Sequence, residues 1–139
     1  MKVVTIIRAG DAMLESFLSI VPHAAVGKIL IQRDESTAQP ILFYSKLPNL
    51  KNKKVVIVDP LLGTGGSVMC AIKVLLDKGA DINNVYFFNV LSCPEGIAAV
   101  LAAFPQVRIV TGCIDDRLNE KFYIEPGLGD FGDRFFGNV

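Results

Sequence analysis

The chain has 139 residues, a length that suits one domain, and 51% of its residues are hydrophobic. Its 14 basic and 14 acidic residues cancel, which gives no support for electrostatically driven binding to nucleic acid or to a membrane surface. The single histidine, His23, excludes a histidine-based triad and a multi-histidine metal site. The three cysteines are widely spaced, and we expect reduced, partly buried thiols in a cytoplasmic protein.

Strand and helix signals alternate along most of the chain. Short apolar, mostly β-branched runs predict strands at Val3–Ile7, Ala25–Ile31, Val55–Val58, Val85–Leu91 and Val107–Val110. Helical spacing of apolar residues predicts helices after Asp11, after Ser67 as far as Gly79, and over about Pro94–Phe104. This alternation predicts an α/β fold, with a mainly parallel sheet covered by helices on both faces.

Other boundaries and segments are less regular in their pattern. Asp11 is expected to cap the first helix. The third helix has two possible starts: Ser92 and Glu95 have the spacing of a capping box, whereas Pro94 favours a start one residue later. The stretch from Arg33 to Pro48 is polar and rich in turns, with a possible strand at Ile41–Tyr44, and the chain after Gly112 is expected to be irregular.

The most informative segment is the predicted strand Val55–Val58 with the turn that follows it. Asp59 stands at the end of the strand, and Thr64-Gly65-Gly66-Ser67 then leads into a helix. A loop of small residues that opens a helix directs several backbone N–H groups at one point, where the helix dipole also favours negative charge. This pattern predicts a phosphate site beside a carboxylate.

The two common nucleotide-binding motifs do not fit this segment. A Walker A loop needs a lysine after its last glycine, and no lysine occurs between Lys54 and Lys73. The dinucleotide fingerprint needs a third glycine where Val68 stands. A plain strand-to-helix turn is the competing interpretation, and Asp59 argues against it, since a carboxylate beside a phosphate cradle suits a ligand that also carries sugar hydroxyls or a metal.

With its acid, the turn resembles the phosphoribosyl-pyrophosphate (PRPP) motif of type I phosphoribosyltransferases, in the Asp-Pro form of the uracil phosphoribosyltransferase family. Three further stretches resemble that family in the same order along the chain. They are the pyrophosphate loop at Ile6–Gly10, the strand and start of the flexible loop at Gly27–Glu35, and the uracil-recognition stretch at Pro126–Arg134.

The resemblance implies one phosphoribosyltransferase domain over residues 1–139, with a mobile loop at about 33–50 and a base-recognition segment at about 112–137. It implies transfer of the phosphoribosyl group of PRPP to uracil, which gives UMP and pyrophosphate. Mg²⁺ is the implied cofactor, held mainly by PRPP, and no protein ligand for the metal is assigned. The implied partners are uracil, PRPP and further copies of the chain in a homodimer or higher homo-oligomer.

The resemblance also assigns residues to these roles. It implies Asp130, Arg8 and Arg33 as catalytic residues, with Arg33 closing over the pyrophosphate. Uracil would be recognised largely by main-chain groups at Ile124, Gly129 and Phe131, with Asp130 near the ribose, the metal or the reacting nitrogen. We expect Asp133 and Arg134 to form a local ion pair and Asp115 and Asp116 to be loop acids. The implied PRPP-binding residues are Arg8, Ala9, Gly10, Arg33, Asp59, Pro60, Leu61, Leu62, Gly63, Thr64, Gly65, Gly66, Ser67 and Asp130.

The sequence departs from the family in one respect that keeps a second hypothesis open. Members of the family carry a long segment before the pyrophosphate loop, whereas here Met1 almost abuts the first strand, and we expect this segment to be lacking. Because the segment contributes to packing and assembly, the alternative is a non-catalytic nucleotide-binding or regulatory domain of the same fold. Transfer to another base is a third hypothesis, which the stretch around Gly129 disfavours.

Overall fold

The computed structural model describes residues 1–138 and builds most of them around one seven-stranded sheet. The strand order is β3-β2-β1-β4-β6, with β7 on the far side of β6 and the short β5 beside the end of β6. All neighbours are parallel except β2 and β3, which are antiparallel. The strands of this sheet are β1 (Lys2–Ile7), β2 (Ala25–Arg33), β3 (Pro40–Lys46), β4 (Val55–Val58), β5 (Leu61–Leu62), β6 (Val85–Ser92) and β7 (Arg108–Ile114).

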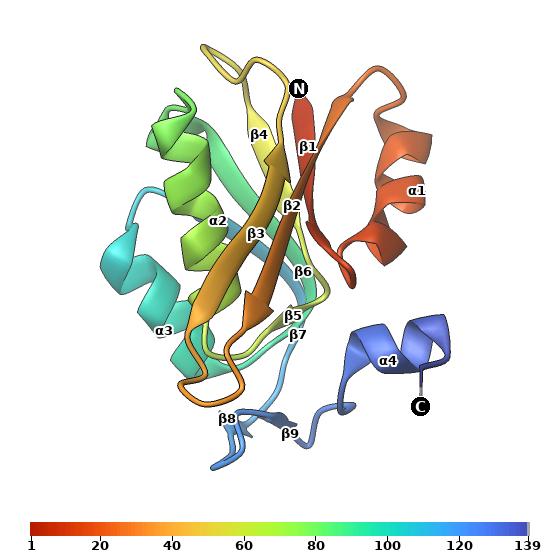
Figure 1. Cartoon of the computed structure of the whole chain (residues 1–139), viewed down its shortest axis with the longest axis vertical. Helices are drawn as coiled ribbons and strands as arrows, with labels where there is room; N and C mark the ends of the chain where they lie inside the picture. Colours follow the sequence, from red (N-terminus) through yellow and green to blue (C-terminus); the bar gives the residue numbers. More distant parts are fainter. Residues whose placement is uncertain (139) are drawn as a thin grey trace.

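Helices cover both faces of the sheet, as Figure 1 shows. α2 (Gly66–Asp77) and α3 (Pro94–Ala103) lie on one face and enclose the larger core, and α1 (Asp11–Ile20) lies on the other over a smaller one. All four residues of β4 are buried, because the strand is covered on both faces. The predicted α/β architecture is therefore confirmed.

The first residues of α1 and α3 can be compared with the starts predicted from the sequence. Gly10, not Asp11, is the N-cap residue of α1, and no side chain caps this helix. The Asp11 carboxylate instead accepts hydrogen bonds from Thr5 and Lys28, so the predicted cap is wrong. α3 begins at Pro94, the later of its two predicted starts.

The C-terminal part is more regular than predicted. β7 continues to Ile114, and a small antiparallel hairpin follows, made of β8 (Arg117–Leu118) and β9 (Ile124–Glu125). A last helix, α4, spans Phe131–Phe136. The chain between these short elements is irregular, as expected, and elements of two to six residues are too short to show a periodic pattern in the sequence.

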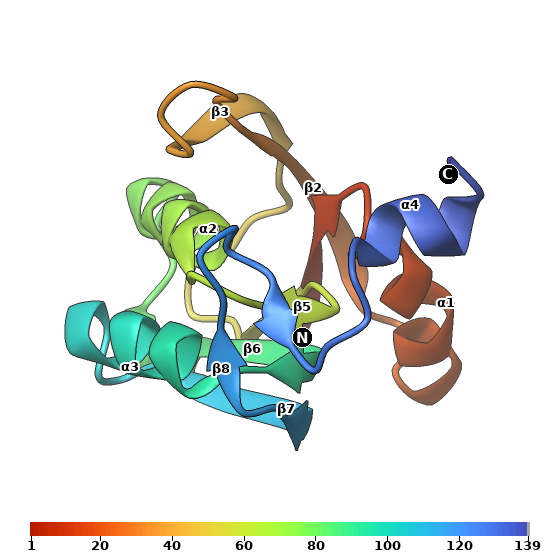
Figure 2. The same cartoon turned by 90° about the horizontal axis from the view of Figure 1, so that it is seen from below.

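The parallel strands end at the lower edge of the sheet in Figure 1, and Figure 2 looks onto this edge from below. β8, β9 and α4 lie across the same edge. In sheets of this kind, ligands bind beyond the carboxyl ends of the strands. The C-terminal segment is thus placed where it can complete a site.

Two further expectations concern the thiols and the membrane. All three cysteines are free: Cys93 is buried and Cys70 partly buried, but Cys113 is exposed, contrary to expectation. Within residues 1–138, no helix has the length and apolar composition needed to cross a lipid bilayer.

Candidate active site

A cavity of about 370 Å³ lies at the carboxyl edge of the sheet and brings together segments that are far apart in the sequence. β1, β2 and β4 each contribute through the residues at or just after their ends, and α2 contributes its first turn. The predicted site residues that line the cavity are Ala9, Arg33, Asp59, Leu61, Leu62, Gly63, Gly65, Ser67, Ile124, Gly129, Asp130 and Phe131. The predicted residues that do not line it are Arg8, Gly10, Pro60, Thr64 and Gly66.

The turn before α2 has the geometry that its sequence predicts. Gly65 is the N-cap residue of α2 and has a φ of 85°, which residues with a side chain rarely adopt. The Thr64 hydroxyl accepts a hydrogen bond from the Gly66 N–H at 3.2 Å. The free N–H groups of the first turn of α2 and its dipole therefore face the cavity in a turn shaped for an anion.

Gly96 of α3 supports this turn from behind, a role that no sequence motif announced. A Cβ atom at Gly96 would lie 2.2 Å from the Gly63 carbonyl oxygen and 2.9 Å from that of Leu62. The Cys93 thiol also donates to the Gly63 carbonyl, at 3.3 Å. The start of α3 is thus packed directly against the backbone of the turn.

Asp59 lies at the end of β4, half-buried in the cavity wall. Burial raises the pKa of its carboxyl from 3.8 to about 8, although the positive charge of Arg33 opposes the shift. At pH 7 the side chain is therefore largely protonated in the protein without ligands. A ligand that supplies hydrogen-bond donors or a cation would stabilise the carboxylate.

Arg33 reaches across the cavity from the end of β2. Its guanidinium donates to the Thr64 hydroxyl at 2.9 Å, so the cation lies beside the anion-shaped turn. The adjoining loop is tightened by Asp34, whose carboxylate accepts bonds from the Ser36 N–H at 2.8 Å and the Thr37 N–H at 2.9 Å. These bonds, together with one from the Ser36 hydroxyl, lower the pKa of Asp34 to about 2.

The loop after β1 contributes one residue, Ala9, to the lining of the cavity. Gly10 lies where a Cβ atom would come within 2.4 Å of the Val58 carbonyl oxygen. The Ile7–Arg8 peptide bond is cis. The Arg8 side chain does not line the cavity: it forms an ion pair with Asp133 at 2.5 Å and donates to the Asn138 side chain.

The base-recognition segment is fixed by its own network of hydrogen bonds. Asp115 accepts a bond from the Gly127 N–H at 2.8 Å, and Arg134 donates to the Leu128 carbonyl at 2.7 Å. The predicted ion pair between Asp133 and Arg134 is thus wrong, because each finds a partner elsewhere. Asp115, expected to be an ordinary loop acid, is a structural support of this segment.

Several cavity residues were not found from the sequence. Lys121, Phe122 and Tyr123 lie on the loop of the β8–β9 hairpin. Val68 follows the turn Thr64–Ser67, and Gly132 lies within the stretch Pro126–Arg134. The hairpin is tied by Arg117, which donates to Glu125 at 2.6 Å, and by Asn119, which donates to the same carboxylate. In the sequence, the opposite charges of Arg117 and Glu125 were the only signal of this hairpin. Their separation along the chain does not indicate a contact unless the hairpin is already known.

Solved structures that resemble this fold include phosphoribosyltransferases of different kinds. An orotate phosphoribosyltransferase from Aeropyrum pernix matches with a TM-score of 0.57 and 22% identity over 81% of this chain and 59% of its own. A purine phosphoribosyltransferase from Pyrococcus horikoshii matches with a TM-score of 0.60 and 18% identity over 83% and 68%. At these identities the likeness concerns the fold alone. The chain thus has the fold of the phosphoribosyltransferase class.

Closer matches give the particular family. The family model described as uracil phosphoribosyltransferase matches residues 1–138. The uracil phosphoribosyltransferases of Dictyostelium discoideum and Saccharomyces cerevisiae are 50% and 48% identical to this chain over 96% of its length. A solved structure of a protein from Aquifex aeolicus superposes with a TM-score of 0.89 at 42% identity, over 96% of this chain and 64% of its own. The chain belongs to the uracil phosphoribosyltransferase family, and it spans 62% of the length of these two curated relatives.

Proposed function

We propose that this chain transfers the phosphoribosyl group of PRPP to uracil. One observation carries the proposal: the anion-shaped turn, Asp59 and the stretch Gly129–Phe131 line one cavity of about 370 Å³. In the reaction, the bond from the anomeric carbon to pyrophosphate breaks and a bond to a uracil ring nitrogen forms. That nitrogen gives up its proton to water or to an oxygen of the leaving pyrophosphate, and the products are UMP and pyrophosphate.

The half of the cavity around α2 fits the ribose and its 5′-phosphate. The turn Thr64–Ser67 offers backbone N–H groups and the Ser67 hydroxyl to the phosphate. Asp59 would accept hydrogen bonds from the ribose hydroxyls. Positive charge grows on the ribose ring as pyrophosphate leaves. The leaving anion must therefore be held, and water must be kept from the anomeric carbon. Arg33 would supply the charge for this, and Ala9 the backbone beside it.

The other half of the cavity fits the base. The imide edge of uracil alternates acceptors and donors, which backbone groups at Ile124, Gly129 and Phe131 can match without a dedicated polar side chain. Asp130 lines the same wall, and one of its oxygens accepts the Asp133 N–H at 2.8 Å as the cap of α4. The carboxylate is therefore held in a fixed orientation beside the reacting centre.

Mg²⁺ fits this set of side chains as an ion bound together with PRPP. Asp59, Asp130 and the substrate's own phosphates would supply oxygen ligands, since Mg²⁺ is commonly held by one or two carboxylates plus substrate phosphates. Residues 1–138 contain no group of three metal-ligating side chains that would form a cage from protein alone. The ion would neutralise charge on the leaving pyrophosphate.

Self-association and a cytoplasmic location complete the proposal. β3 forms an edge of the sheet, and two neighbouring aromatic residues on it are exposed, Phe43 by 59% and Tyr44 by 52%. An exposed apolar edge strand favours pairing with a second chain, so we place the interface of a homodimer here. The free thiols favour a reducing compartment and hence the cytoplasm.

The test is UMP formation from labelled uracil, PRPP and Mg²⁺. We expect turnover by the unmodified chain, and a loss of about a hundredfold or more in kcat/KM for PRPP in Arg33→Ala. Arg108→Ala removes an arginine outside the cavity and should leave kcat/KM unchanged. Binding of PRPP without turnover would favour the non-catalytic alternative. Turnover with orotate, adenine or hypoxanthine in place of uracil would contradict the assignment of the base.

A further inference from the structure

Asn89 is a buried polar residue of β6 that the proposed mechanism does not use. Only 5% of its surface is exposed, and its side chain lies on the same side of the sheet as those of Val85 and Phe87. The side-chain amide donates to the Leu91 carbonyl at 3.0 Å and to the Ser92 hydroxyl at 2.6 Å. Both of its protons are therefore bound by the end of its own strand.

The hydrogen bonds beyond Ser92 fix the direction in which this amide faces. The Ser92 and Thr111 hydroxyl oxygens are 2.9 Å apart, and the Thr111 hydroxyl donates to the Cys113 carbonyl at 3.0 Å. Because Thr111 uses its only proton there, Ser92 must donate to Thr111 and accept from Asn89. A flipped amide would place its oxygen against the Leu91 carbonyl, so the Asn89 side chain has one orientation.

β6 departs from regular strand geometry next to Asn89. The Pro60 carbonyl accepts both the Val90 N–H at 2.9 Å and the Leu91 N–H at 3.0 Å. Successive N–H groups of a regular strand point to opposite sides, so their convergence on one oxygen requires a local distortion of the backbone. The Asn89 amide stabilises this shape, because it bridges the distorted stretch to the Leu91 carbonyl.

The distorted stretch is the part of β6 that lies against the end of β4. The Asp59 N–H donates to the Phe88 carbonyl at 3.3 Å, and the next residue, Pro60, is held by the two N–H groups described above. The backbone of Asp59 and Pro60 is thus bonded to the residues on either side of Asn89. We propose that Asn89 is a positioning residue for Asp59: its amide sets the shape of β6, and β6 sets where the Asp59 carboxyl group stands in the cavity.

This inference rests on the proposed function, in which Asp59 binds the ribose of PRPP. Asn89→Leu keeps the size of the side chain and removes both N–H donors, whereas the Oδ1 atom that it also removes has no hydrogen-bond partner within residues 1–138. We expect the KM for PRPP to rise at least about fivefold and the KM for uracil to change by less than about twofold. Ser92→Ala leaves the bond to the Leu91 carbonyl in place and should raise the KM for PRPP less than Asn89→Leu does.

A double-mutant cycle separates positioning from a general loosening of the core. If Asn89 acts through Asp59, Asn89→Leu should change the KM for PRPP by less than about twofold in the Asp59→Asn background. Equal fold losses in the two backgrounds would show that Asn89 acts elsewhere, and the inference would be wrong. A rise confined to the KM for uracil would also overturn it, since the Ser92 carbonyl accepts the Asp115 N–H at 2.8 Å and offers a route to the base half.

Asn83 offers a matched control. Like Asn89, it donates from its side-chain amide, in this case to the Asp81 carboxylate at 3.0 Å, but it is exposed and lies before β6 begins. Asn83→Leu should leave both KM values unchanged. A rise in the KM for PRPP as large as that in Asn89→Leu would mean that the effect does not depend on the bonds of Asn89, which would contradict the inference.

Hydrogen exchange separates a failure of this inference from a failure of the proposed function, because it needs neither substrate nor turnover. In Asn89→Leu, the amides of Asp59, Val90 and Leu91 should exchange at least about tenfold faster, while exchange in α2 stays unchanged. Unchanged protection of these three amides would overturn the inference even if the chain makes UMP. Faster exchange at all three would uphold the positioning role even if it makes none.

Discussion

Asp59 is a half-buried carboxyl group at the wall of the cavity. Its pKa of about 8 in the folded protein exceeds the ordinary value of 3.8, so between these pH values the folded state binds the proton and the unfolded state does not. The contribution of Asp59 to the free energy of unfolding therefore falls as pH rises from about 4 to about 8 and changes little above that. In the proposed function this cost is offset when the ribose hydroxyls or a cation bind the carboxylate.

Replacing Asp59 by asparagine removes this cost. We expect Asp59→Asn to match the unmodified protein in stability near pH 4 and to exceed it by about 2 kcal/mol or more at pH 9. Urea unfolding at pH 4.5, 7 and 9 measures the difference. Asp116→Asn, at an exposed acid, serves as the control and should show no such trend. Stability curves for Asp59→Asn and the unmodified protein that run parallel across this range would contradict the assigned pKa.

A second prediction concerns Gly96. Replacing this glycine by alanine should lower the stability of the protein, although helix propensity alone would raise it. In an ordinary exposed helix, a change from glycine to alanine stabilises by up to about 1 kcal/mol. At Gly96 the new Cβ would meet the Gly63 carbonyl oxygen at 2.2 Å. We therefore expect Gly96→Ala to destabilise by about 2 kcal/mol or more and to raise the KM for PRPP, because the turn must shift.

Thermal unfolding and steady-state kinetics test this together. Ala102→Gly, at an exposed position of the same helix, should cost about 1 kcal/mol and leave the KM for PRPP unchanged. A Gly96→Ala variant as stable as the unmodified protein would show that α3 does not support the turn.

The elements differ in how far the sequence predicts them. β4 and the turn after it can be predicted from a short stretch of sequence. Four successive apolar residues indicate a buried strand, and the two glycines after the acid indicate a tight turn. The hairpin β8–β9 and α4 follow from contacts between distant residues, such as Arg8 with Asp133 and Asp115 with Gly127. Nothing near Asp115 in the sequence reveals a partner twelve residues away. The motifs of the site were therefore predictable, and the supports that hold them together were not.

Asp115 shows how one such contact supports a whole segment. Its carboxylate holds the Gly127 N–H at the turn that leads to Gly129–Phe131. We expect Asp115→Asn to raise the KM for uracil severalfold, since an amide accepts a weaker bond than a carboxylate. Kinetics with each substrate varied in turn gives the result, and Asp116→Asn should leave both KM values unchanged. Equal losses for uracil and PRPP would point to a general disturbance of the fold.

On the scale of the whole molecule, the parallel sheet explains how residues 97 positions apart come to share one cavity. Arg33 and Asp130 both line it, although one ends β2 and the other begins α4. The carboxyl ends of parallel strands lie at one edge, and the C-terminal segment lies across that edge (Figure 2). The free edge of the sheet at β3 lies outside this arrangement.

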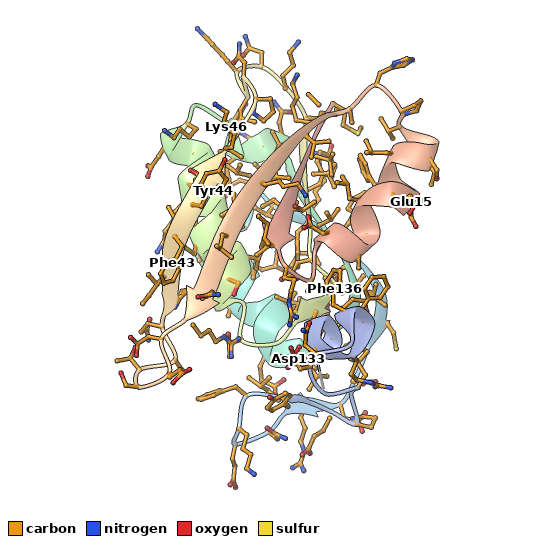
Figure 3. The ribbon with its side chains drawn as sticks, turned by 45° about the vertical axis from the view of Figure 1, so that its right-hand side comes forward. Glu15, Phe43, Tyr44, Lys46, Asp133 and Phe136 are labelled. Carbon is orange, nitrogen blue, oxygen red and sulfur yellow. The ribbon has the colours of Figure 1, made fainter. Side chains whose placement is uncertain are left out.

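The exposed aromatic pair on β3 predicts how the protein associates. Phe43 and Tyr44 lie along the outer strand in Figure 3, with Lys46 at its end. Antiparallel pairing of two β3 strands would join the sheets of two copies and bring their aromatic side chains into contact beside one another, which buries part of their apolar surface. A charge at this position must remain solvated, so Phe43→Lys should shift a dimer towards monomer by at least about tenfold in Kd. Sedimentation equilibrium measures this shift.

Ile20→Lys, at a residue of α1 that is 82% exposed, should leave the mass unchanged. If Ile20→Lys dissociated the dimer and Phe43→Lys did not, the interface would lie on the α1 face instead.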